Sequence, residues 1–198
     1  MEKLTKEFAK KLMETEGEAR GINLKTDWEV ILSKYGKEGL EKLEAKMAEL
    51  GYPVKYNEIR TMDFYPVGLD ALSVLSIKEV FDLDDQELKE LGAAAVKFSL
   101  FLKILIKYFP SLNLLAKEAP KMWRKHYSVG DLEVVETNEK EKRAVLRIKN
   151  FSFHPSQCAN LQGYFSKILE MAVKAHVTCA ETKCTFRGDA YHEFVIKW

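Results

Sequence analysis

Four side chains of the types that bind zinc lie in the last quarter of the sequence: Cys158, Glu181, Cys184 and His192. Cys158 lies at the start of a predicted helix, and Glu181 and Cys184 lie in the first strand of a predicted hairpin. The turn signal Arg187-Gly188-Asp189 precedes the second strand, which would bring His192 back beside Cys184. Two thiolates, an imidazole and a carboxylate complete a tetrahedral zinc shell without a position for water. The residues therefore predict a structural zinc site and not a catalytic one.

Two nearby residues compete for places in this shell. Cys179 could replace Glu181, and His154 is a reserve ligand four residues before Cys158. Alternation along a strand places Cys179 and Glu181 on the same face, so a local bulge is needed to bring Cys184 beside either of them. The sequence leaves open which of the two is the ligand. Without a metal, the cysteines would be small buried apolar residues.

Composition restricts the classes of function. The chain has 198 residues, most simply one domain, and its 31 basic and 30 acidic residues leave a net charge of +1. This balance provides no general attraction for nucleic acid, so we expect none as a partner. Three cysteines are a poor disulfide framework and suit a reducing cytoplasm. The apolar segment 100–109 contains Lys103 and Lys107 and is too short to span a membrane, so we expect a cytoplasmic protein without a membrane span.

The order of the predicted elements indicates an α+β fold. Apolar residues recur at helical spacing through the first two-thirds of the chain, including a strongly apolar helix from about Asp85 to Phe109 and another over 112–126. The pattern then changes to a hairpin around Asn138, a helix over about 156–174 and a second hairpin over 176–198. We therefore predict a helical N-terminal half followed by a ββαββ unit with an antiparallel sheet.

Apolar stripes before residue 60 predict contacts beyond a single helix. We assign residues 1–60 to an N-terminal helical extension and residues 61–198 to a ligand-binding domain. The extension could pack against a second copy, which predicts a homodimer. The residues that motivate this prediction are Leu4, Phe8, Leu12, Leu40, Leu43 and Met47.

A group of aromatic and apolar residues is the candidate ligand pocket. Singly, each is a core residue; together they form an apolar wall with two phenolic hydroxyls and an indole N–H, which suits a small aromatic or lipid-like molecule. Small residues at 92–95 let a ligand or helix approach the backbone. The pocket candidates are Phe98, Phe101, Leu102, Leu105, Trp123, Tyr127 and Tyr164.

The tail from Cys184 to Trp198 resembles the end of the 4-vinyl-reductase domain family, with its cysteine, Arg-Gly-Asp turn and aromatic-flanked strand. The lead-in is also similar: Trp123, then Tyr127-Ser128-Val129-Gly130, a hairpin, and a helix opening at Cys158. The resemblance covers about residues 60–198. It implies a small-molecule-binding module, usually dimeric, within a superfamily that includes haem-based nitric oxide sensors and vesicle-tethering subunits.

In regulators of this family that sense aromatic compounds, Cys, Glu, Cys and Cys bind zinc. The resemblance therefore implies Cys158, Glu181 and Cys184 as ligands, with His192 in place of the last cysteine. Related haem sensors use a Tyr-x-Ser-x-Arg motif that is missing here, and His126 is the only histidine before residue 150, so we do not expect haem.

These inferences predict a sensor or carrier of a small apolar or aromatic molecule, with a structural zinc and a separate signalling partner. No nucleophile–base pair or phosphate-binding loop is evident, so we do not expect an enzyme. Two alternatives remain: a protein-interaction scaffold resembling vesicle-tethering subunits, and an enzyme or accessory protein acting on a tetrapyrrole-like substrate. The identity of the ligand is not predicted.

Overall fold

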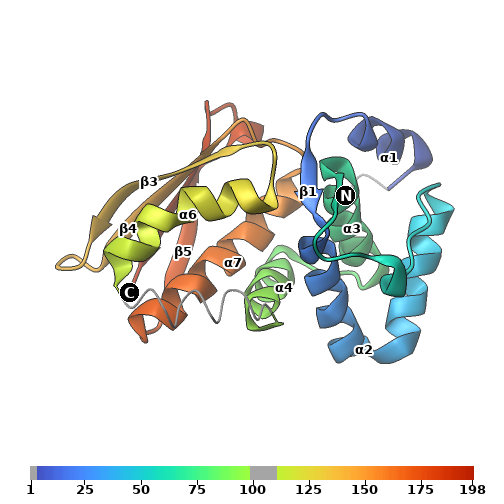
Figure 1. Ribbon diagram of the computed structural model, residues 1–198, viewed down its shortest axis with the longest axis horizontal. Coiled ribbons are helices and arrows are strands. Elements are labelled where there is room, and N and C mark those ends of the chain that lie inside the picture. Colours follow the sequence, from blue (N-terminus) through green and yellow to red (C-terminus); the bar gives the residue numbers. More distant parts are fainter. Residues whose placement is uncertain (1–3, 99–110) are drawn as a thin grey trace.

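The computed structural model describes residues 4–98 and 111–198. These residues form α-helices and an antiparallel sheet (Figure 1). Its first part contains α1 (Lys6–Met13), β1 (Glu18–Arg20), α2 (Gly21–Glu49), a 3-10 turn (Tyr56–Glu58), β2 (Phe64–Pro66), α3 (Val67–Val80), α4 (Asp85–Phe98) and α6 (Leu112–His126). The second part contains β3 (Asp131–Asn138), β4 (Arg143–Lys149), α7 (Pro155–Val173), β5 (Thr178–Lys183), a 3-10 turn (Thr185–Arg187) and β6 (His192–Lys197). The predicted α+β order is confirmed.

Local chemistry explains where several helices begin and end. Ser111 caps α6 by accepting a hydrogen bond from the Leu114 amide at 3.3 Å. Asp84 and Glu87 exchange side-chain and backbone hydrogen bonds of 2.8 and 2.9 Å, which is a capping box at the start of α4. Pro155 occupies the first turn of α7, and Lys174 ends that helix in a left-handed conformation.

The four-stranded sheet has the order β3-β4-β6-β5, with every neighbouring pair antiparallel. Helices α6 and α7 pack against this sheet, while α1, α2 and α3 form a separate group of helices (Figure 1). The sheet and its two helices share one hydrophobic cluster, centred on side chains such as Trp123, Ile148, Phe165 and Phe194. This arrangement places the start of α7 beside the turn between β5 and β6.

Helix α7 also packs closely against α4. A Cβ atom at Gly92 would collide with the carbonyl oxygen of Asn160, and one at Gly163 would collide with the carbonyl oxygen of Lys89. Glycine is therefore required at both positions for the two backbones to approach. The sequence predicts that another helix or a ligand approaches the small residues after Leu91. At Gly92 the structure shows such an approach, by helix α7.

The apolar stripes of the N-terminal helices are used inside the chain. Leu4, Leu12, Leu43 and Met47 are buried in one cluster with side chains of α3 such as Leu72. Phe8 and Leu40 are partly buried against the same cluster. The homodimer and the boundary at residue 60 remain predictions, but this apolar surface no longer supports the dimer because it already has an intramolecular partner.

The sequence analysis missed the two-stranded sheet that joins β1 to β2. Each of these strands has three residues, which is too short for an alternating pattern to be recognised. Helix α2 is interrupted at Gly36, where φ is 68° and ψ is −165°, so it consists of two helical segments joined at a kink. Within the described residues, no helix combines the length and apolar character needed to cross a bilayer.

Candidate metal centre and ligand cavity

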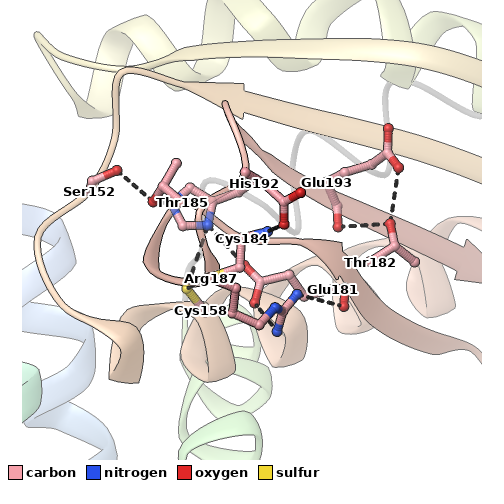
Figure 2. Close-up of polar contacts among 10 residues, drawn as sticks. Ser152, Cys158, Glu181, Thr182, Cys184, Thr185, Arg187, His192 and Glu193 are labelled. Carbon is pink, nitrogen blue, oxygen red and sulfur yellow. Dashed lines mark hydrogen bonds and ion pairs between the residues drawn. The ribbon is translucent and has the colours of Figure 1, made fainter.

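Three different elements bring the four predicted metal-binding side chains together (Figure 2). Cys158 lies in the first turn of α7, and Glu181 lies on β5. Cys184 follows β5 directly, and His192 is the first residue of β6. The pairing of β5 with β6 shifts between Glu181 and Lys183, which is the local irregularity that the sequence analysis required. The shift lets Glu181 and Cys184 reach the same point.

The candidate ligand atoms form a compact, buried group. All four lie within 4.8 Å of one another. The Cys158 Sγ atom lies 3.9 Å from the Cys184 Sγ atom and 3.6 Å from the His192 Nδ1 atom. His192 Nδ1 lies 2.8 Å from Glu181 Oε1. These four atoms are therefore a candidate metal centre, because each is of a type that zinc accepts.

The distances can be compared with an ideal zinc site. Zinc–sulfur bonds of ~2.3 Å at a tetrahedral angle separate two sulfur atoms by about 3.8 Å, and a sulfur from a nitrogen by about 3.6 Å. The two contacts of Cys158, at 3.9 and 3.6 Å, agree with these values. The 2.8 Å contact between His192 and Glu181 is a hydrogen-bond distance. It would have to open to about 3.3 Å around an ion.

A second layer of contacts orients the cluster. His192 Nε2 lies 2.8 Å from the Thr185 hydroxyl, which lies 2.7 Å from the Ser152 hydroxyl. A metal-binding histidine commonly donates its other N–H to such an acceptor, and this fixes the tautomer. Arg187 Nη1 lies 3.5 Å from Glu181 Oε2. Two thiolates and a carboxylate around one zinc ion leave the site with a net negative charge, which the Arg187 charge would offset.

Burial and neighbouring charges shift the pKa values of the cluster. Burial raises the pKa of the Cys158 thiol, and Glu181 and Cys184 raise it further. Burial also acts to raise the pKa of Glu181, but hydrogen bonds from His192, Cys158 and Cys184 outweigh it and lower that pKa. Zinc binding would have to release the proton that burial holds on the Cys158 thiol, so zinc affinity should fall in acid.

The two competing residues lie elsewhere. Cys179 pairs with Ile196 across β5 and β6 and packs against the hydrophobic cluster of the sheet. Burial raises its pKa to about 12. His154 caps α7 by accepting a hydrogen bond from the Ser156 amide at 3.1 Å. Neither belongs to the four-residue group, so the geometry favours Glu181 over Cys179.

A cavity of about 180 Å³ opens between the sheet, α6, α7 and the N-terminal helices. Three predicted pocket residues, Trp123, Tyr127 and Tyr164, line it. The Trp123 and Tyr127 rings lie 4.7 Å apart, and the Trp123 Nε1–H group donates to the Val129 carbonyl at 3.1 Å. Of the remaining candidates, Phe101, Leu102 and Leu105, and also the side chain of Phe98, lie outside the part of the chain that the structure describes.

One end of this cavity is acidic, which the sequence analysis missed. Asp27 on α2 and Asp70 on α3 both line it and are buried. The Tyr127 hydroxyl donates to Asp70 Oδ2 at 3.1 Å. Burial raises the pKa of Asp70 to about 7, although this hydrogen bond opposes the shift. Burial and then the Asp70 charge raise the pKa of Asp27 well above its ordinary value.

His126 also lines the cavity. Its Nδ1 atom lies 3.1 Å from Asn23 Oδ1. Burial, followed by the charges of Arg20 and Lys125, lowers the pKa of His126 to about 4. A signal for Asp70 was present in the sequence: it is the single carboxylate in the apolar helical run 67–77, and carboxylates are rarely buried unless they are paired. Asp27 gave no such signal, because it lies among Lys25, Thr26 and Glu29.

Comparison with known proteins identifies the fold. No protein family model and no curated protein sequence matches this chain, so the resemblance to the 4-vinyl-reductase family stays a prediction.

Solved structures do match. One is an Fe(II) unliganded H-NOX protein from K. algicida, with 14% identity, a TM-score of 0.62, and coverage of 90% of this chain and 95% of that one. Another is an H-NOX protein from S. oneidensis in the Fe(II)NO state, with 13% identity, a TM-score of 0.59, and coverage of 90% and 98%. A third, titled for haem redox potential and porphyrin distortion, has 13% identity, a TM-score of 0.56, and coverage of 90% and 99%. This chain therefore has the fold of H-NOX proteins, and at these identities the likeness extends to the fold alone.

Proposed function

We propose that this chain is a sensor or carrier domain that binds a small apolar or aromatic molecule and holds a structural zinc ion. The observation that carries the proposal is the cavity of about 180 Å³ beside Trp123, Tyr127 and Tyr164. A dry cavity of about 150 Å³ is large enough to bind benzene. Apolar walls with a few convergent polar groups are the usual features of a small-molecule site.

In this proposal Cys158, Glu181, Cys184 and His192 hold the zinc ion. The residues of the chain fill a tetrahedral shell, so the ion would have a structural role and would not activate water. Its effect would be to connect the hairpin of β5 and β6 to the first turn of α7. Metal binding would then add to folding stability, because the unfolded chain has no preformed site.

Haem, which is named for one of the structural neighbours, does not fit the residues of this cavity. Haem carries two propionates, which need cationic or hydrogen-bond-donating partners. The described part of the lining has no lysine or arginine, and it presents the carboxyl groups of Asp27 and Asp70. Neither acid can supply the positive charge that would balance the propionates. The Tyr-x-Ser-x-Arg motif is also missing from the sequence.

The alternatives receive different support. Exposed large apolar residues of the described chain are few and include Met62, Phe64 and Phe186, which gives little support to a scaffold. Convergence of Asp27, Asp70 and His126 on one cavity is the observation that favours an enzyme. We nevertheless propose a binding protein without catalysis, because the described part of the lining places no cysteine or serine beside these groups. A second copy and a separate signalling chain are the proposed partners.

Native mass spectrometry combined with a fluorescent reporter tests both parts of the proposal. Gently purified protein should carry one zinc ion per chain, and it should bind the uncharged reporter N-phenyl-1-naphthylamine saturably. Ala116 lines the cavity, so Ala116→Phe should abolish reporter binding. Leu114 is exposed on the same helix, so Leu114→Phe is the matched control and should bind normally. Absence of saturable binding by the unmodified protein would contradict the ligand-binding proposal.

A further inference from the structure

Two buried carboxyl groups at one end of the cavity have no cationic partner in it. Asp27 is 8% exposed and Asp70 is 4% exposed. Asp70 accepts a hydrogen bond from Tyr127, but no described residue donates one to Asp27. The described lining contains no lysine or arginine. Buried carboxylates are normally paired or coordinated, because removal from water penalises an isolated charge.

A second observation at the same cavity also points to a missing partner. Gln157 on α7 lines the cavity, is 7% exposed, and its Oε1 atom accepts no hydrogen bond. The amide nitrogens of Asn23 and Asn160, which also line it, are buried without an acceptor. Most buried polar atoms in folded proteins are hydrogen-bonded, and leaving one unpaired costs about 1–3 kcal/mol. A hydrogen-bond donor on a ligand in this cavity would supply the partner that Gln157 Oε1 lacks.

We propose that the ligand of this cavity carries a protonated amine on an apolar or aromatic body, and that Asp27 and Asp70 bind the amine. This inference rests on the proposed function and narrows the class of ligand. The ammonium group would donate to the two carboxylates and to Gln157 Oε1, while the body would lie against the Trp123 side of the cavity. A charge-assisted hydrogen bond is about twice as strong as a neutral one.

The electrostatics of the pair support this assignment. Without a ligand, burial raises the pKa of Asp70 to about 7, and burial together with the Asp70 charge raises the pKa of Asp27. The two acids therefore resist carrying two negative charges next to each other. A cation between them removes that penalty and restores both ionised forms. A neutral hydroxyl could hydrogen-bond to one acid, but it would not offset the charge of both.

Calorimetric titration with three small probes of one shape tests the proposal. The probes are 2-phenylethylamine, 2-phenylethanol and phenylacetate, which are cationic, neutral and anionic at pH 7.5. We expect the amine to bind at least about tenfold more tightly than the alcohol, and phenylacetate to bind most weakly. Asp27→Asn and Asp70→Asn should each reduce the preference for the amine about tenfold. Asp85→Asn removes an exposed carboxylate of α4 and should leave the preference unchanged.

The outcomes separate this inference from the proposed function. Equal binding of amine and alcohol, or a preference that survives both cavity substitutions in variants at least as stable as the unmodified protein, would overturn the assignment of an amine. If the uncharged reporter binds but phenylethylamine neither binds nor displaces it, the cavity binds ligands and the amine inference is wrong. If the reporter itself does not bind, the proposed function fails first.

Discussion

The metal centre and the acidic end of the cavity both bury ionisable groups, but these groups differ in how many hydrogen-bond and charge partners the protein gives them. At the metal centre, the Glu181 carboxylate contacts His192 at 2.8 Å and Arg187 at 3.5 Å. Thr185 in turn contacts the second nitrogen of His192 at 2.8 Å. In the cavity, Asp27 has no hydrogen bond from the described residues, and Gln157 Oε1 is unpartnered.

This difference is informative because the two sites share one helix. Gln157 and Cys158 are consecutive residues in the first turn of α7, yet Gln157 lines the cavity and Cys158 belongs to the metal centre. Successive helical residues point about 100° apart, so one turn can serve two sites. The side chains of the metal centre already contact one another, whereas the unpartnered groups of the cavity indicate a site for a ligand.

The largest expected effect breaks the metal centre. Cys184→Ser should destabilise the protein by roughly 5 kcal/mol and lower the melting temperature by about 10 °C or more, because the ion loses a ligand. Chelation of the unmodified protein should produce a similar drop, and the variant should show no further loss. Cys179→Ser should cost less, since that thiol lies outside the cluster. Equal melting curves for the two variants would contradict a structural metal.

The next effect concerns the acidic end. Asp70→Asn should stabilise the protein at pH 8 by up to about 4 kcal/mol. The pKa of Asp70 is about 7 when folded, against an ordinary value of 3.8. The folded state therefore holds a proton that the unfolded state releases, and stability declines as pH rises from about 4 to 7. The amide keeps an acceptor for the Tyr127 hydroxyl.

The measurement is the free energy of unfolding of both proteins in urea, from pH 5 to pH 8. The gain from Asp70→Asn should be smallest at pH 5 and largest at pH 8. Titration of His126 is common to both proteins, so it largely cancels in the difference. Loss of the Asp70 charge also lowers the pKa of Asp27, which adds to the gain at high pH. A gain that does not change with pH would show that Asp70 is ionised throughout the range.

A third substitution separates the two sites along α7. Gly163→Ala places a methyl group against the Lys89 carbonyl oxygen, so α4 and α7 must move apart at a cost of about 3 kcal/mol. Reporter binding in the neighbouring cavity should weaken. Zinc stoichiometry should remain unchanged, because Cys158 lies more than a turn away. Gln162→Ala, on the adjacent position of the same helix, is the control for helix propensity and should do neither.

The smallest expected effect is at the edge of the metal centre. Thr185→Ala removes the hydroxyl that lies 2.8 Å from His192 Nε2. We expect zinc affinity to fall about tenfold and stability to fall by about 1 kcal/mol, because the imidazole loses the contact that orients it. Thr185→Ser keeps the hydroxyl and should retain most of the affinity. Competition with a chromogenic chelator measures both variants.

Much of the fold follows from local patterns. The helix of α7, the two hairpins and the helical first half could be predicted because apolar periodicity and turn residues act over a few neighbours. The pairing of β1 with β2 could not, since strands of three residues carry too little pattern. Apolar spacing also could not show that Leu43 and Met47 would be covered by α3 and not by a second copy.

The sequence by itself determined which residue types were available for a metal, and a hairpin with a required bulge was enough to place Glu181, Cys184 and His192 near one another. Only the tertiary structure decided that Glu181 and not Cys179 joins Cys158, because the choice depends on the register shift between β5 and β6. The acidic end was likewise decided in three dimensions. Asp27 and Asp70 are 43 positions apart by their residue numbers, and local spacing cannot predict that two distant helices bury both carboxyl groups in one cavity.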